Sequence, residues 1–198
     1  MKKALNLLGA VVMVVMLFGV AKADQLAFVT TLTGSQEVPP NASPGIGSAL
    51  VTLDTVTNML TVNVSFSGLL SPTVASHIHC CTPPGANAMV ATVVPTFPGF
   101  PLGVTTGTYL QTFDLTLASS YNPAFITAHG GTVAGAQAAF ISGLISGQTY
   151  LNIHTSQFPG GEIRGQLQAV PEPATLLLMG TGLVAAVGAI RKRAGRRS

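Results

Sequence analysis

Residues 48–54 (SALVTLD) and 59–67 (MLTVNVSFS) are the stretch of sequence that decides the fold. In the second segment apolar and polar residues alternate, which is the period-two pattern of a strand with one buried face. The apolar members are Leu60, Val62, Val64 and Phe66. The four residues 55–58 between the segments suit a tight turn. The sequence therefore predicts an antiparallel β-hairpin here.

The same kind of pattern continues on both sides of the hairpin. Further strands are predicted at residues 25–33, 74–79, 88–94, 108–117, 148–154 and 162–168. Segments rich in Gly and Pro separate them, notably 34–47 and 95–103, and these are expected to be loops. The predicted fold class is all-β, an antiparallel β-sandwich of about seven or eight strands.

One segment departs from this pattern and predicts a short helix. Between residues 132 and 145 the apolar side chains recur at spacings of three and four, with alanines between them. Thr132 is a suitable N-cap and Gly147 a suitable residue to end the helix. We expect this helix to cover an opening of the sandwich.

The N-terminal 23 residues have the organisation of a signal peptide. Two lysines near the start precede an apolar run at residues 5–20, and Ala21 and Ala23 form an A-x-A cleavage site. Cleavage after Ala23 would leave a mature chain that begins at residue 24, and residues 24–169 would form its one domain.

The C-terminal segment, residues 170–198, has a different organisation. Pro171, Glu172 and Pro173 precede 17 uncharged, largely apolar residues at 174–190, and a basic cluster ends the chain. An apolar helix of this length is about the minimum that spans a bilayer. Positive charge directly after it keeps that end in the cytoplasm. We therefore predict a C-terminal transmembrane helix.

The charge of the chain is concentrated in these two ends. The 198-residue sequence has a formal net charge of +3, but between residues 24 and 169 the only Lys or Arg is Arg164, against five acidic residues, which gives −4. Binding to nucleic acid requires clustered cations, so the central region is not expected to bind it.

The two cysteines, Cys80 and Cys81, are adjacent. Neighbouring Cα atoms lie about 3.8 Å apart, below the usual range of about 4.4–6.8 Å for a disulfide. A vicinal disulfide, two free thiols, a metal-binding role and an intermolecular bond are the alternatives at this stage.

Three histidines form a candidate metal site. His77 and His79 are two residues apart on a predicted strand, so both side chains project from the same face. His154 lies on another predicted strand and would join them if the two strands were neighbours. Cys80, Cys81 or Glu162 could complete a tetrahedral Zn²⁺ or Cu site. The alternative is that the imidazoles only hydrogen-bond backbone carbonyls and brace the fold.

Glu162 and Arg164 are two residues apart on the last predicted strand. The first interpretation is a structural clamp, either as a fixed ion pair or as a hold on the backbone of the loop at 37–40, because a planar guanidinium suits that role. The alternative is capture of a carboxylate or an acidic sugar.

Three separated motifs resemble the CHRD domain, the module named after chordin. They are TGSQEVPP at 33–40, ASHIH at 75–79, and GQTYLNIHT with FPGGEIRGQL at 147–155 and 158–167. Residues 170–198 are similar to a PEP-CTERM sorting tail. That resemblance implies recognition by an exosortase, removal of the tail near Pro171–Glu172–Pro173, and release to the cell surface or the extracellular matrix.

These observations lead to two functional hypotheses. The first is an exported, non-enzymatic CHRD protein, processed by signal peptidase and exosortase and held briefly in the membrane, with a binding, adhesion or matrix role that involves extracellular or biofilm polysaccharide and needs no cofactor. No nucleophile elbow, P-loop or dinucleotide fingerprint is found in the sequence. The second is a Zn- or Cu-binding redox or metal-buffering protein that uses His77, His79 and His154.

Overall fold

The computed structural model describes residues 25–170. The expected signal peptide with Ala21 and Ala23, the sorting motif Pro171–Glu172–Pro173 and the expected transmembrane helix all lie outside the described residues. None of the helices between residues 25 and 170 is long and apolar enough to span a membrane.

Every strand of the described region belongs to one antiparallel sheet, in the order β5-β4-β7-β8-β1-β2-β3-β6, with β9 also paired to β1. The strands are β1 Gln25–Thr33, β2 Ile46–Asp54, β3 Met59–Ser67, β4 Thr73–Cys80, β5 Met89–Val90, β6 Gly107–Asp114, β7 Thr149–Thr155, β8 Ile163–Gln166 and β9 Gln168–Ala169. The predicted antiparallel β class is confirmed. The two packed sheets of a sandwich are not, because the strands pair continuously.

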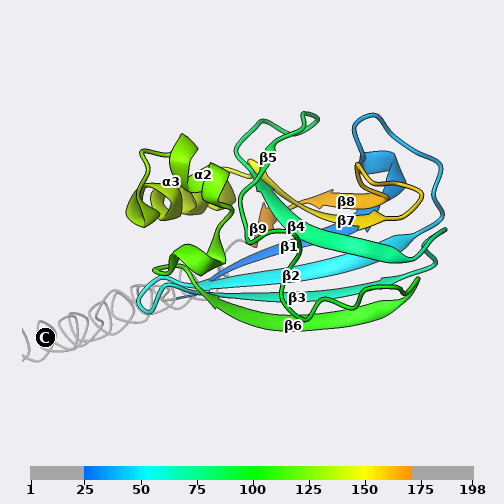
Figure 1. Ribbon diagram of the computed structural model, residues 1–198, viewed down its shortest axis with the longest axis horizontal. Coiled ribbons are helices and arrows are strands. Elements are labelled where there is room, and N and C mark those ends of the chain that lie inside the picture. The colour runs from blue at the N-terminus through cyan, green and yellow to red at the C-terminus, as the bar shows by residue number, and fades with distance from the viewer. Residues whose placement is uncertain (1–24, 171–198) are drawn as a thin grey trace, which may run out of the picture.

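The sheet curls, and its inner face encloses the hydrophobic core (Figure 1). An irregular segment, residues 91–105, follows the short edge strand β5 and runs along β4 towards the other edge strand, β6. Its backbone donates from Ala91 N to Ile78 O and from Phe97 N to Ser76 O. Phe97 also stacks on Tyr109 of β6. This segment therefore covers the gap between the two edges.

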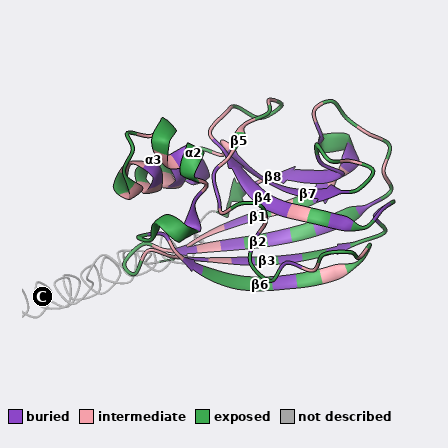
Figure 2. Ribbon diagram, in the orientation of Figure 1, coloured by how far each residue is buried: buried purple, intermediate pink, exposed green. Residues whose placement is uncertain are grey.

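The β2–β3 hairpin forms where the sequence predicts it. Leu53 pairs with Leu60 and Val51 with Val62, so the alternating apolar residues share the core face. The Asp54 carboxylate accepts hydrogen bonds from the backbone N–H groups of the turn that follows. In Figure 2 the burial colours are banded along β2, β3 and β6, as expected for strands with one outward face.

The predicted helix is also present, as α3 (Val133–Ile145). The Thr132 hydroxyl accepts a hydrogen bond from Gly135 N at its start, and Gly147 follows its end with a φ of 67°. The prediction missed α2 (Pro123–Ala128) and two short 3-10 helices, Gly34–Gln36 and Ala118–Ser120. Residue Asn122 caps α2 and Pro123 begins it, a pattern typical of helix starts.

Three of the strand predictions were too long, and the last of them, at 162–168, is regular in β8 only over Ile163–Gln166. The predicted strand at 108–117 ends at Asp114, whose carboxylate accepts from Thr116 N and Oγ1 and turns the chain. As a result Leu117 lies outside the strand and is exposed. The predicted strand at 88–94 is regular only over the two residues of β5.

β8 approaches β1 so closely at Gly165 that no room is left for a side chain there. A Cβ at this position would overlap the Thr31 carbonyl oxygen and the Thr30 hydroxyl, and a backbone atom cannot move aside. We expect Gly165→Ala to lower the free energy of unfolding by about 1–3 kcal/mol, the usual range for overpacking. At Gly160 a Cβ would meet nothing within 4 Å, so Gly160→Ala is the matched control. Urea unfolding measures both, and equal losses would contradict the described strand approach.

Candidate metal centre

Strand alternation places the three histidines on one face of the sheet. In β4 the side chains of Ser76 and Ile78 face the core, so His77 and His79 face the opposite way. β7 lies next to β4, with His77 opposite Asn152 and His154 opposite Ala75. The strands are therefore neighbours, which is the condition that the sequence alone left open.

This second face is buried as well, because loops cover it. β7 is buried along its whole length, as its uniform colour in Figure 2 shows. The covering loops supply one backbone carbonyl to each imidazole. His77 Nε2 lies 2.6 Å from Pro95 O, His79 Nδ1 lies 2.8 Å from Ala88 O, and His154 Nδ1 lies 3.0 Å from Pro159 O.

These carbonyls determine the tautomer of each ring. A carbonyl oxygen can only accept a hydrogen bond, so the nitrogen that contacts it must carry the proton. The other nitrogen of each neutral ring then holds a lone pair. These nitrogens are His77 Nδ1, His79 Nε2 and His154 Nε2. All three are buried and have no hydrogen-bond partner among the described residues.

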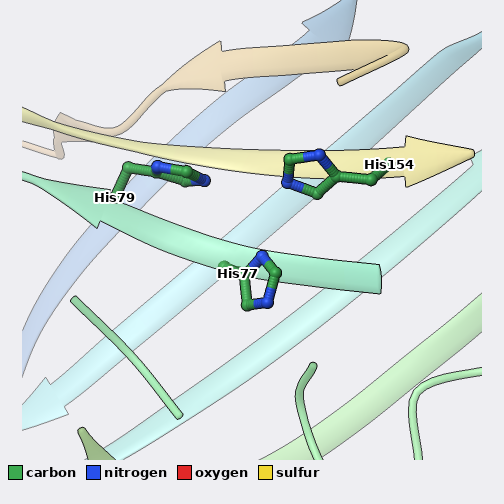
Figure 3. A group of neighbouring side chains, drawn as sticks. All are labelled: His77, His79 and His154. Carbon is green, nitrogen blue, oxygen red and sulfur yellow. The ribbon is translucent and has the colours of Figure 1, made fainter. Parts of the chain in front are cut away.

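The three rings lie over β4 and β7 on one face of the sheet and are turned towards one another (Figure 3). One ring nitrogen from each histidine lies within 4.8 Å of the other two. The rings are 6–9 % exposed. Imidazole nitrogens bind Zn at about 2.0–2.1 Å, so small side-chain rotations would bring all three to one ion. A carbonyl on the far nitrogen is the usual outer partner of a metal-bound histidine.

Burial also keeps the rings in the form that binds metals. Desolvation lowers the pKa of His79 and of His154 to about 4, and it lowers the pKa of His77 in the same direction. All three rings are therefore neutral at pH 7. A metal would not have to displace a proton from them near neutral pH.

A stack of side chains borders the site. The Tyr150 ring lies parallel to the His79 ring with centroids 4.6 Å apart, and the Arg164 guanidinium lies 4.2 Å from the Tyr150 centroid. Arg164 also donates to Gln36 O and to the side-chain oxygen of Asn87. It thereby ties together two of the loops that cover the face.

Glu37 is a buried acid in this region that the sequence did not single out. Burial raises its pKa to about 7, against the opposing effect of Arg164 and a hydrogen bond from Asn152. Glu37 Oε1 and Asn152 Oδ1 have no hydrogen-bond partner among residues 25–170. Strand parity could have indicated Asn152, because it lies two residues before His154 in β7 and so shares its face. Nothing in the sequence predicts that the loop that carries Glu37 lies near this face.

The residues expected to complete a tetrahedral site do not join it, and that expectation is wrong. Among the described residues, the only group with metal-binding geometry is His77, His79 and His154. Cys80 and Cys81 are bonded to each other and lie against Ala139 of α3. The fourth histidine, His129, contacts Phe125 O at the end of α2.

Glu162 is also occupied elsewhere. Its carboxylate accepts from Ser43 Oγ and Leu70 N at 2.6 Å each and from Thr155 Oγ1 at 2.7 Å. The structure therefore shows no ion pair between Glu162 and Arg164. The two residues hold different loops, Glu162 the segment around Ser43 and Leu70, and Arg164 the segments around Gln36 and Asn87.

The fold and the site together define a small all-β domain with a buried three-histidine centre. A family model of the CHRD domain matches residues 28–167, and a model of the PEP-CTERM protein-sorting motif matches residues 169–193. The chain therefore belongs to the CHRD domain family, and both resemblances seen in the sequence are confirmed. No curated protein and no solved structure matches it. The sorting motif is a signal for exosortase-type processing, so the protein is exported.

The lowered histidine pKa values predict a pH dependence of stability in the metal-free protein. In the unfolded chain His79 and His154 take up protons below their ordinary pKa of 6.5, whereas in the folded chain they stay neutral down to about 4. The unfolded state binds more protons in this window, so stability is lost as the pH falls through it. At pH 5 the loss is about 2 kcal/mol for each histidine.

Glu37 acts in the opposite direction over part of the same window, because its pKa is raised. The measurement is therefore a comparison of the wild type with a His79→Gln/His154→Gln variant, by urea unfolding at pH 7.5 and pH 5. The change in stability between the two pH values should differ by about 4 kcal/mol between the two proteins. The same pH dependence in both proteins would contradict the described burial of the rings.

Proposed function

We propose that this exported CHRD protein binds one transition-metal ion, copper or zinc, through His77, His79 and His154. The observation that carries the proposal is the convergence of three buried ring nitrogens that lack hydrogen-bond partners in the described region. A buried polar atom without a partner costs about 1–3 kcal/mol. A bound cation would satisfy all three nitrogens at once.

The interpretation that the histidines only brace the fold accounts for one nitrogen of each ring and leaves the other nitrogen unexplained. The carbonyls of Pro95, Ala88 and Pro159 explain why one nitrogen of each imidazole is fixed. They do not explain why the other three nitrogens face a common point. Bracing alone would require only one hydrogen bond per ring and no convergence, whereas a metal site requires both.

The proposed role is storage, buffering or structural use of the ion, without catalysis. The three histidines are almost completely buried, and the loops that cover this face of the sheet hold them. A catalytic metal usually keeps an open position that a substrate can reach. Burial of this degree favours retention of an ion over turnover of a large extracellular substrate.

Metal loading tests the proposal directly. The metal-free protein, supplied with Zn²⁺ or copper and then desalted, should retain about one ion per chain by elemental analysis. It should also gain about 2.7 kcal/mol of stability when the free metal is 100 times its Kd. His77→Gln and His154→Gln should each weaken binding by more than about 100-fold, because loss of even an outer residue costs up to that much.

The matched control is His129→Gln, since His129 lies on α2's C-terminal end and outside the cluster. It should bind metal as the wild type does. Retention of less than about a tenth of an equivalent by the wild type would end the proposal.

A binding or matrix role towards polysaccharide is the second candidate, and one surface favours it. The outward face of β1, β2, β3 and β6 is exposed and rich in hydroxyl groups. Two of its cross-strand rows are Thr31–Ser48–Ser65–Thr108 and Ala27–Thr52–Thr61–Thr112, and the row between them is Val29–Leu50–Asn63–Leu110. A groove of about 580 Å³ follows the first row, and no charged side chain lines it. Such a surface would suit an uncharged polysaccharide.

Affinity electrophoresis in gels that contain dextran tests this second role. The wild-type chain should be retarded, and Ser65→Glu should weaken retardation by about tenfold, because a carboxylate would lose hydration in the contact. Ser119→Glu, at an exposed serine away from this face, is the control. Equal mobility of all three proteins with and without dextran would argue against the role.

A further inference from the structure

We infer that the three-histidine centre is selective for Cu(I) over Zn²⁺. This inference rests on the proposed metal-binding function and adds the identity and charge of the ion.

The ligand set is electrically neutral. Each ring has its proton on the nitrogen that contacts a loop carbonyl, so it offers a lone pair and no charge. No carboxylate or thiolate of the described residues joins the three nitrogens. A bound ion would therefore keep its full charge inside the protein. The electrostatic cost of burying an ion rises with the square of its charge, so a dication costs about four times as much as a monocation.

A fixed positive charge stands close to the ligands and disfavours a dication more than a monocation. Arg164 lies over Tyr150, which stacks on His79, so a guanidinium stands one ring away from the ligand. The acid in the region, Glu37, is outside the group of ligands. Glu162 is held by Ser43, Leu70 and Thr155. A monovalent ion would meet less repulsion here than Zn²⁺.

The number of donors points in the same direction. Zn²⁺ in buried structural sites is almost always four-coordinate and tetrahedral. Cu(I), a d¹⁰ monocation, accepts three ligands in a plane without a fourth. The sulfur atoms that could have served as a fourth donor are bonded to each other and lie against α3. Three imidazoles from two adjacent strands therefore match the coordination of Cu(I) more closely than that of Zn²⁺.

The experiment uses the full chain, metal-free and in mild detergent. Under argon it is titrated with Cu(I), supplied as the acetonitrile complex, in competition with bicinchoninate. A parallel titration uses Zn²⁺ and a chromophoric zinc chelator. We expect one Cu(I) per chain and at least about 100-fold weaker binding of Zn²⁺. A tenfold excess of Zn²⁺ should leave the bound Cu(I) in place.

X-ray absorption at the copper edge gives an independent readout. It should show three nitrogen neighbours at about 2.0 Å and no sulfur neighbour. The variants His77→Gln and His154→Gln should lose Cu(I) binding while their circular dichroism stays that of the wild type, and His129→Gln should retain it. If one of the two variants unfolds, the other variant and the absorption spectrum still test whether the histidines bind Cu(I).

The outcomes separate this inference from the function on which it rests. Zn²⁺ bound as tightly as Cu(I), displacement of Cu(I) by Zn²⁺, or a sulfur neighbour would overturn the selectivity and leave a metal site. Binding of neither ion would overturn both the selectivity and the proposed function.

Discussion

The antiparallel register between β4 and β7 is the constraint on which both the core and the site depend. Ile78 lies opposite Leu151, and both face the core; the next pair, His79 and Tyr150, faces the opposite side. A slip of one residue would exchange the two faces and place imidazoles in the core. The hydrogen bond from Ser76 Oγ to Asn152 O, at 2.9 Å, adds a side-chain contact to this register.

The face that this register creates is stabilised less by its own contacts than by the loops around it. Five of its polar atoms lack hydrogen-bond partners in the described region, on Glu37, His77, His79, Asn152 and His154. Each costs free energy, so the face needs compensation from elsewhere. Arg164 supplies part of it by joining the loops at Gln36 and Asn87. Because one of these loops also carries Ala88, the same guanidinium helps to hold the carbonyl that orients His79.

Much of the fold could be predicted from the sequence, because its signals are local. The bounds of β1 and β3 were predicted to the residue, since alternation and flanking turns determine them. Strand parity likewise predicted that His77 and His79 share a face. The adjacency of β4 and β7 could not be predicted this way, since it depends on pairing between residues 69–82 positions apart. The continuity of the sheet is another nonlocal property.

The error at Glu162 shows where parity fails. The prediction began the last strand at residue 162 and so gave Glu162 and Arg164 the same face. In the structure β8 begins at Ile163, and Gly161 precedes it with a φ of 131°, a conformation that favours glycine. The chain turns at this point, and the Glu162 carboxylate reaches Thr155 and Ser43 instead. Alternation holds only inside a regular strand, and Glu162 stands just before one.

The C-terminal end of the described domain lies directly before the sorting motif, and its position shows what cleavage there would remove. Val170 N donates to Ala27 O, and β9 pairs with β1, so both ends of the described domain leave from the same end of the sheet. The core residues fall between Phe28 and Leu167, and the three histidines fall between residues 77 and 154. Cleavage near Pro171 would therefore remove no core residue and none of the three histidines. Histidine also suits the space outside the membrane, where thiols tend to form disulfides and become unavailable as ligands, whereas imidazoles do not. A cluster made only of imidazoles, with both cysteines already bonded to each other, would thus remain intact after such a cleavage.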